Sequence, residues 1–326
     1  MATTSADTAP ASPDLVPGEA GARPVRRVRR HFSVLTRRDK LLLGLMVGIP
    51  VFLDLALVWG PTVASVFLSF TDWRGIQGLN ASNFVGLKNY QTLFFSYLFF
   101  WPAVSHNLLW LGFFLLVATP IGILLAVLLD RELRGSRFYQ TAFYLPVVLS
   151  LALIGFIWQL QYAPDNGFLN SILGRTANGD EINWLGDPSI NIWAVIIAAS
   201  WRQVGYVMLL YLAGLKSVDP ALKEAAAIDG ANERQTFFRV VFPVMAPINV
   251  VILVITVIES LRAFDLAYII NGGKNGLELL STLITNNSIS EASLVGFGSA
   301  IAVVLLVISL VPILFYLSRA MRQDRQ

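Results

Sequence analysis

The sequence contains no cysteine, so disulfide bonds and thiolate metal sites are excluded along all 326 residues. Charged side chains are also scarce: 14% of residues carry a charge, whereas a soluble domain usually has about 25%. Hydrophobic residues make up 55% of the chain, and the mean hydropathy is +0.63. This charge deficit, together with apolar runs of about 20 residues, predicts an all-α polytopic membrane protein and gives no indication of nucleic-acid binding.

The residues that would support catalysis are equally few. The two histidines, His31 and His106, are far apart in the sequence and form no metal-binding cluster. No phosphate-binding G-x-x-x-x-G-K-S/T motif occurs, and Gly272-Gly-Lys274 lacks its spacing. We therefore predict a non-catalytic chain that holds no cofactor and no metal of its own.

The N-terminal segment differs in composition from the rest. Its first 22 residues, MATTSADTAPASPDLVPGEAGA, are small, polar and proline-rich, as is typical of disordered chain. A basic cluster from Arg23 to Lys40 follows, and the apolar run after it is too long for the core of a signal peptide. We predict that residues 1–38 are a disordered basic tail and that residues 39–326 form one transmembrane domain.

Six apolar runs in this domain are long enough to cross a bilayer, which takes about 20 residues. The first is interrupted by Pro50, Asp54 and Gly60-Pro61, and is expected to tilt or kink. The predicted spans cover approximately residues 41–70, 107–129, 138–161, 192–215, 245–270 and 297–317.

Lysine and arginine are distributed unevenly around these spans. Eighteen lie before the first span, after the second, after the fourth and after the sixth. The opposite loops hold only Arg74, Lys88, Arg175 and Lys274. Because the side rich in Lys and Arg faces the cytoplasm, both termini and the loop of residues 216–243 are predicted to lie inside.

The loop after the fourth span has strong local signals. Asp219 is placed to cap a helix over Ala221–Ile228, and Gly230 follows as a residue that readily takes positive φ. Asn232 is placed to cap a second helix over Glu233–Phe242. These signals predict a short helix-turn-helix, which either acts on a partner or packs beneath the spans.

The sequence from Glu224 to Ala231, EAAAIDGA, continuing to Val241-Phe-Pro243, resembles the EAA loop of bacterial ABC importer permeases. Two segments, Asn271-Gly-Gly-Lys-Asn and Asn286-Asn-Ser-Ile-Ser, depart from the family pattern. The rest of the chain, from about Leu41 to Ala320, is similar to the sugar-importer branch that includes the maltose and glycerol-3-phosphate permeases. Its motifs are FVGLKNY from Phe84, DRELRG from Asp130, YLP from Tyr144, WLGDP from Trp184, WRQVG from Trp201, LAGL from Leu212, AFD from Ala263 and GFGSA from Gly296.

The resemblance implies a type I ABC importer permease fold in a bacterial cytoplasmic membrane. It implies as partners a second permease subunit, most often a different chain, two ATPase subunits that bind ATP and Mg²⁺, and an extracellular protein that delivers a small carbohydrate. The EAA loop would dock on an ATPase subunit, with Phe237 and Phe238 either anchoring in that partner or packing under the spans. The coupling residues that the motif implies are Glu224, Ala225, Ala226, Asp229, Gly230, Phe237, Phe238 and Pro243.

Charged residues also occur within the predicted spans, where they cost free energy. Glu259, Arg262 and Asp265 are three residues apart, so neighbours would meet on one side of a helix. Two interpretations stay open: internal ion pairs that fix helix packing, and a polar translocation path with aromatic side chains that stack on a sugar ring. The residues concerned are Trp201, Arg202, Tyr206, Glu259, Arg262 and Asp265.

Three functions follow from these patterns. An ABC importer permease for a carbohydrate accounts for both the EAA loop and the charged spans, and a permease for glycerol-3-phosphate or another polyol derivative is its variant. An ion-coupled secondary transporter would use the intramembrane carboxylates but has no reason to carry an EAA loop, and no inverted repeat is evident. A membrane scaffold would not need Arg202, Glu259 and Arg262.

Overall fold

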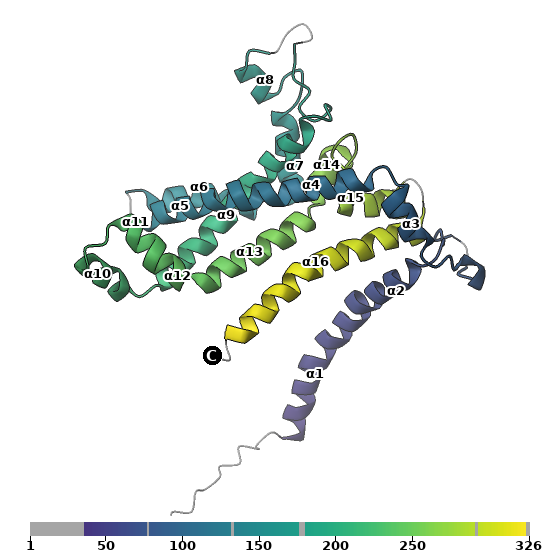
Figure 1. Ribbon diagram of the computed structural model, residues 1–326, viewed down its shortest axis with the longest axis horizontal. Helices are drawn as coiled ribbons and strands as arrows, with labels where there is room; N and C mark the ends of the chain where they lie inside the picture. Colours follow the sequence, from purple (N-terminus) through teal and green to yellow (C-terminus); the bar gives the residue numbers. More distant parts are fainter. Residues whose placement is uncertain (1–35, 77, 132–133, 176–179, 291–292, 324–326) are drawn as a thin grey trace, which may run out of the picture. The chain divides into compact units, whose positions relative to one another are not determined.

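The computed structural model describes residues 36–76, 78–131, 134–175, 180–290 and 293–323 (Figure 1). Residues 1–35, which make up most of the predicted tail, and Arg325 lie outside this range. The chain divides into two units, residues 1–54 and 55–326. In the described part of the first unit, α1 (Arg37–Asp54) is an apolar helix with Pro50 inside it and exposed side chains along most of its length.

The regular secondary structure in the described part of the second unit is helical, apart from one isolated bridge between Thr71 and Phe84. Four of its elements are short π-helical segments and one, η2, is a 3₁₀ turn. In order, they are η1 (Leu55–Trp59), α2 (Gly60–Leu68), η2 (Ala81–Asn83), α3 (Lys88–Phe95), α4 (Phe100–Phe113), η3 (Phe114–Ala118), α5 (Thr119–Asp130), α6 (Ser136–Val148), α7 (Leu151–Gln161), α8 (Phe168–Ile172), α9 (Asn191–Ser217), α10 (Pro220–Ile228), α11 (Glu233–Thr236), η4 (Phe237–Val241), α12 (Phe242–Val244), α13 (Ala246–Leu261), α14 (Asp265–Asn271), α15 (Leu280–Thr285), η5 (Asn286–Ser290) and α16 (Val295–Gln323).

Four helices in the described residues are long and apolar enough to cross a membrane, and two bent pairs raise the number of candidate spans to as many as six. The prediction of a polytopic helical protein is therefore confirmed. The four are Arg38–Leu68, Phe100–Asp130, Asn191–Ser217 and Val295–Leu314, and the bent pairs are Ser136–Val148 with Leu151–Gln161 and Glu233–Val244 with Ala246–Asn271.

The third predicted span was wrong as an unbroken helix. Its two helices, α6 and α7, meet at an angle of 102°. Leu149 is extended, with ψ of 144°, and the hydroxyl of Ser150 accepts a hydrogen bond from the backbone N–H of Leu153 at 3.2 Å. Ser150 thereby caps a new helix instead of continuing the old one.

The fifth predicted span is also broken. The axis bends by 75° at Met245, which separates α12 from α13. A second interruption follows Leu261, where Arg262 takes φ −91° and ψ 4° and the next helix, α14, begins only at Asp265. The apolar run extends across both interruptions, so composition alone does not reveal them.

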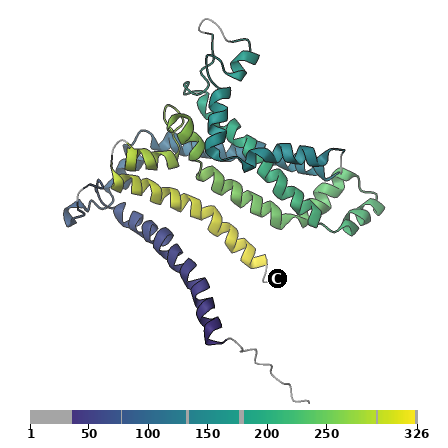
Figure 2. The same ribbon diagram turned by 180° about the vertical axis from the view of Figure 1, so that it is seen from behind.

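Helix α9 is the centre of the second unit and packs against α5, α6 and α13, as both views show (Figures 1 and 2). Glycine makes these contacts close. A Cβ atom at Gly122 of α5 would lie 2.8 Å from Val207, and one at Gly205 would lie 2.2 Å from the carbonyl oxygen of Phe143 in α6. Small residues at such contacts let helix backbones approach each other within a membrane.

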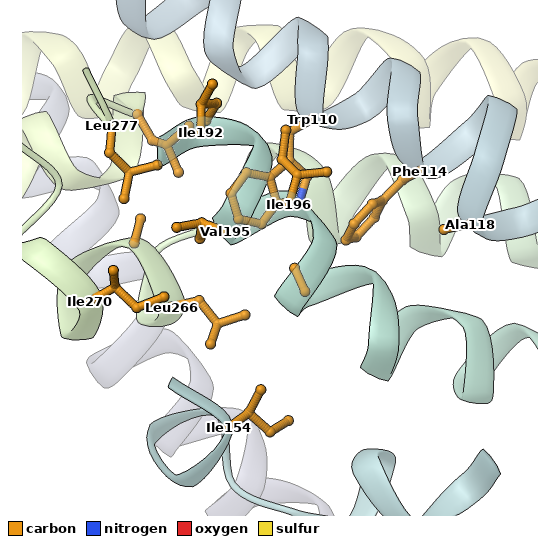
Figure 3. Packing of buried hydrophobic residues seen from close by; sticks show 13 residues of the cluster. Trp110, Phe114, Ala118, Ile154, Ile192, Val195, Ile196, Leu266, Ile270 and Leu277 are labelled. Carbon is orange, nitrogen blue, oxygen red and sulfur yellow. The ribbon is translucent and has the colours of Figure 1, made fainter. Parts of the chain in front are cut away.

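A buried apolar cluster brings together segments that are far apart in the sequence (Figure 3). Trp110 of α4 and Phe114 of η3 lie against Val195 and Ile196 of α9, and Ile154 of α7 belongs to the same cluster. Leu266 and Ile270 of α14 complete it from the other side of the break after α13. The cluster therefore fixes α14 relative to α4 and α9.

The segment that departs from the family pattern, Asn271–Asn275, forms a turn with several side-chain ties. The side-chain amide of Asn271 donates to the carbonyl of Lys274 at 2.9 Å, and that of Asn275 donates to the carbonyl of Gly186 at 2.6 Å. Nearby, backbone and side-chain hydrogen bonds from Ser189 hold the pKa of Asp187 below its usual range. These contacts tie the turn to the WLGDP segment that precedes α9.

Candidate functional site

A cavity of about 200 Å³ lies beside the buried cluster, and we call it the charged cavity. Its walls come from α4, η3, α9, α13, α14 and the break between the last two, with a further side chain from α7. Four charged groups and three aromatic rings share this small volume. The lining residues are Trp110, Phe114, Leu151, Ala199, Arg202, Gln203, Glu259, Arg262, Ala263, Phe264, Asp265 and Leu266.

Arg202 and Glu259 form an ion pair across this cavity. The Nη1 of Arg202 lies 3.5 Å from Oε2 of Glu259, and the two side chains are 26% and 40% exposed. The Nε of Arg202 and the indole Nε1 of Trp110 are buried without a hydrogen-bond partner among the described residues. Buried donors are normally satisfied, so these two groups are exceptions within the described part of the site.

Arg262 and Asp265 line the charged cavity, but both lie beyond the end of the helix that carries Glu259. The expectation that they share one helix with Glu259 is wrong, because α13 ends at Leu261 and Asp265 is the first residue of α14. All three residues nevertheless line the charged cavity.

The aromatic side chains of the cavity are not the ones that the sequence suggests. Trp201 packs edge to face against Trp158, with ring centroids 6.0 Å apart, and neither Trp201 nor Tyr206 is among the lining residues. The aromatic residues that line the cavity are Trp110, Phe114 and Phe264. No signal in the sequence separates these three from other aromatic residues in apolar runs.

The second candidate site is the segment of residues 219–243, which we call the coupling segment. Asp219 caps α10 by accepting from the N–H of Ala221 at 2.9 Å, and Asn232 caps α11 by accepting from the N–H of Gln235 at 2.9 Å. Gly230 lies between them with φ of +77°. The predicted caps, turn and first helix are confirmed, whereas the second helix passes through the π-helical segment η4 and continues to Val244.

The side chains of the coupling segment divide into exposed and packed ones. The side chain of Glu224 is exposed and makes no hydrogen bond or ion pair within the described residues. Ala225, Asp229 and Pro243 are also exposed, whereas Ala226 is buried. The two phenylalanines differ as well: Phe237 packs near Tyr211 and Val241, while Phe238 is 57% exposed.

A family model described as "Binding-protein-dependent transport system inner membrane component" matches residues 118–323, which include α5, α9, the coupling segment and the charged cavity's α13 and α14 walls. The chain belongs to this family. It is therefore a multi-pass permease of an ABC importer and not a catalytic subunit, since ATP hydrolysis in this family belongs to a separate subunit.

Individual relatives cover most of this permease. The xylose/arabinose import permease protein XacH of Haloferax volcanii is 33% identical over 266 residues, which are 81% of this chain and 83% of the relative. The sn-glycerol-3-phosphate transport system permease protein UgpA of Agrobacterium fabrum is 32% identical over 275 residues, which are 83% and 91% of the two chains.

The fold of the permease is also that of a solved importer. A chain in the crystal structure of a bacterial alginate ABC transporter, in complex with an alginate pentasaccharide-bound periplasmic protein, superposes with a TM-score of 0.72 at 25% identity. The match covers 86% of this permease and 93% of that chain. Within the described residues, no cluster of three or more His, Asp or Glu side chains is arranged to hold a metal ion.

Proposed function

We propose that this permease forms part of the translocation path of an ATP-driven importer whose substrate is a carbohydrate delivered by an extracellular binding protein. The observation that carries the proposal is the charged cavity, which combines ion-pair partners and aromatic rings inside the helical unit. Relatives named for sugar import, and the alginate transporter, support the same substrate class.

The chemistry of the cavity suits a sugar ring. Hydroxyl groups both donate and accept hydrogen bonds, so they can bind the partly exposed guanidinium group of Arg202 and the carboxylate of Glu259 at the same time. Trp110 adds an apolar ring to the lining. Charge-assisted hydrogen bonds are stronger than neutral ones. A few charged side chains would therefore be enough to bind the substrate briefly as it crosses the membrane.

The assembly that we propose has six spans, with both termini and the coupling segment in the cytoplasm of a bacterial cell. A second permease subunit, usually a different chain, completes the path, and two ATPase subunits bind beneath it. The coupling segment docks on one ATPase through Glu224, Gly230 and Phe238, so that ATP-driven closure tilts the spans.

Glycerol-3-phosphate or another polyol derivative is the alternative substrate. Two guanidinium groups, Arg202 and Arg262, line the cavity, and arginine binds phosphate well. The likeness to UgpA favours this alternative. Substrate uptake into proteoliposomes distinguishes a neutral sugar from an anionic ligand.

The proposed function can be tested with the reconstituted importer complex. With its ATPase subunits and cognate binding protein in proteoliposomes, we expect the permease to take up a radiolabelled carbohydrate that the binding protein retains, and to do so only with ATP inside the vesicle. Uptake of a polyol phosphate but of no neutral sugar would select the alternative. Uptake driven by an ion gradient without ATPase subunits would contradict both.

The orientation can be tested separately, because the chain has no native cysteine. Ser82, Asn166 and Ser217 are exposed in the structure and lie on predicted opposite sides. We expect Ser82→Cys and Asn166→Cys, but not Ser217→Cys, to react with a membrane-impermeant maleimide in intact cells. Permeabilised cells are the control for Ser217→Cys. The reverse pattern would invert the proposed topology.

A further inference from the structure

Two adjacent residues at the end of α5 carry opposite charges and reach different helices of the coupling segment. Asp130 is the last residue of α5, and its Oδ2 lies 3.3 Å from Nζ of Lys223 in α10. Arg131 follows, and its Nη2 lies 2.6 Å from Oε2 of Glu233, the first residue of α11. The two ion pairs therefore connect α5 to the coupling segment on both sides of the Gly230 turn.

The order of the charges fixes how the segment sits on α5. Exchanging the partners would place Asp130 beside Glu233 and Arg131 beside Lys223, so that both contacts would become repulsive. The pairs join residues 93 and 102 positions apart in the chain, so they constrain tertiary structure and not local helix geometry.

The space beneath these pairs is not filled. A cavity of about 290 Å³ is lined by residues of the coupling segment and of the ends of α5 and α9, and Val127, Leu215 and Phe237 are among its apolar lining residues. Both ion pairs lie on the rim of this cavity. The coupling segment therefore contacts α5 through polar side chains at this cavity, and it contacts α9 through Val241, which is buried with Tyr211 and Leu215.

Helix α5 connects the two ion pairs to α9, which lines the charged cavity. Ala126 and Leu129 of α5 are buried in one cluster with Val207, Met208 and Tyr211 of α9. Nearer the N-terminus of α9, Arg202 lines the charged cavity. A force on α10 or α11 can therefore pass through Asp130 and Arg131 to α5, and then through packed side chains to α9.

We propose that Asp130 and Arg131 are positioning residues for energy coupling: they hold α10 and α11 against α5 so that movement of the coupling segment moves α9. The proposal rests on the proposed function of the coupling segment. Neither residue needs to touch ATP, substrate or the ATPase subunit. Because exposed ion pairs add little to stability, charge reversal should leave the permease folded.

The functional test reverses one pair and then restores it. In the reconstituted complex, we expect Arg131→Glu to lower substrate uptake per ATP hydrolysed by about fivefold, the lower end of typical coupling between sites. The double variant Arg131→Glu with Glu233→Arg should restore the ratio, because it rebuilds the pair with its charges exchanged. Arg134→Glu, at an exposed arginine with no ion pair in the described residues, should leave the ratio unchanged.

A second measurement does not depend on transport. Leu124→Cys on α5 and Ile228→Cys at the end of α10 are exposed sites for spin labels, and the chain offers no competing thiol. We expect one narrow distance distribution in the parent protein, a broad one with Arg131→Glu, and a narrow one again in the charge-exchanged variant. An absence of uptake in the parent complex would overturn the proposed function, and this distribution would still decide the positioning role.

Three results would overturn the positioning role. The first is that Arg131→Glu keeps both the narrow spin-label distance distribution and the parental ratio of substrate uptake to ATP hydrolysis. The second is a lowered ratio with no change in the distribution, which would place Arg131 in direct contact with the ATPase. The third is failure of the charge-exchanged variant to restore the parental behaviour.

Discussion

Replacing Gly230 with valine should uncouple ATP hydrolysis from transport. Gly230 has φ of +77°, and a Cβ atom built on it would meet nothing within 4 Å. The effect of valine therefore comes from the backbone alone, since a β-branched residue enters this region only with strain of about 1–3 kcal/mol. A shift of that size in the turn corresponds to roughly a 5- to 150-fold loss of coupling between the sites.

The measurement is ATP hydrolysis stimulated by the loaded binding protein, together with the amount of ATPase subunit that copurifies. Gly230→Asn is the matched control, because asparagine tolerates positive φ and should keep most of the activity. Glu224→Ala should weaken ATPase association for a separate reason, the loss of charge-assisted hydrogen bonds worth about 1.5–3 kcal/mol. Full activity of Gly230→Val with Glu224→Ala would show that this segment is not the coupling element.

Glu259→Gln should abolish most transport while the complex still assembles. The carboxylate is 40% exposed and pairs with Arg202 at 3.5 Å across the charged cavity, so it is available to a substrate and is not a fully buried structural charge. Glutamine keeps the shape of the side chain but loses the charge. The loss of one charge-assisted hydrogen bond, about 1.5–3 kcal/mol, corresponds to a drop of roughly tenfold or more in uptake.

Glu278→Gln is the control for this substitution. It makes the same chemical change at a glutamate that accepts from the N–H of Gly276, outside the charged cavity. Uptake should stay at the parental level. A complex that fails to assemble with Glu259→Gln would assign the pair with Arg202 to helix packing, and unchanged uptake would remove Glu259 from the translocation path.

The sequence predicts local structure well where side chains act on their own backbone. Asp219 and Asn232 cap the helices that follow them, and Gly230 forms the turn between. Long uniform runs are also predicted closely: the fourth expected span, 192–215, corresponds to α9 at Asn191–Ser217. In each case the decisive interaction lies within a few residues, so the pattern contains it.

Features that depend on tertiary contact were not predictable in the same way. Apolar composition is unchanged across Leu149 and Met245, although the chain bends there by 102° and 75°. The partner of Arg202 lies 57 residues away, and nothing local selects Glu259 over Asp265. The ion pairs of Asp130 and Arg131 were missed because each looks, in the sequence, like an ordinary charge at the end of a span.

The close contacts of α9 have a consequence for how the permease moves. At Gly122 the backbone of α5 fits against Val207, and at Gly205 the backbone of α9 fits against the carbonyl of Phe143. If α5 or α6 slid along α9, a residue larger than glycine would move into one of these close contacts and would clash. We therefore expect α5, α6 and α9 to rotate as one rigid body. The hinges then fall at the helix breaks, near Ser150, Met245 and Arg262.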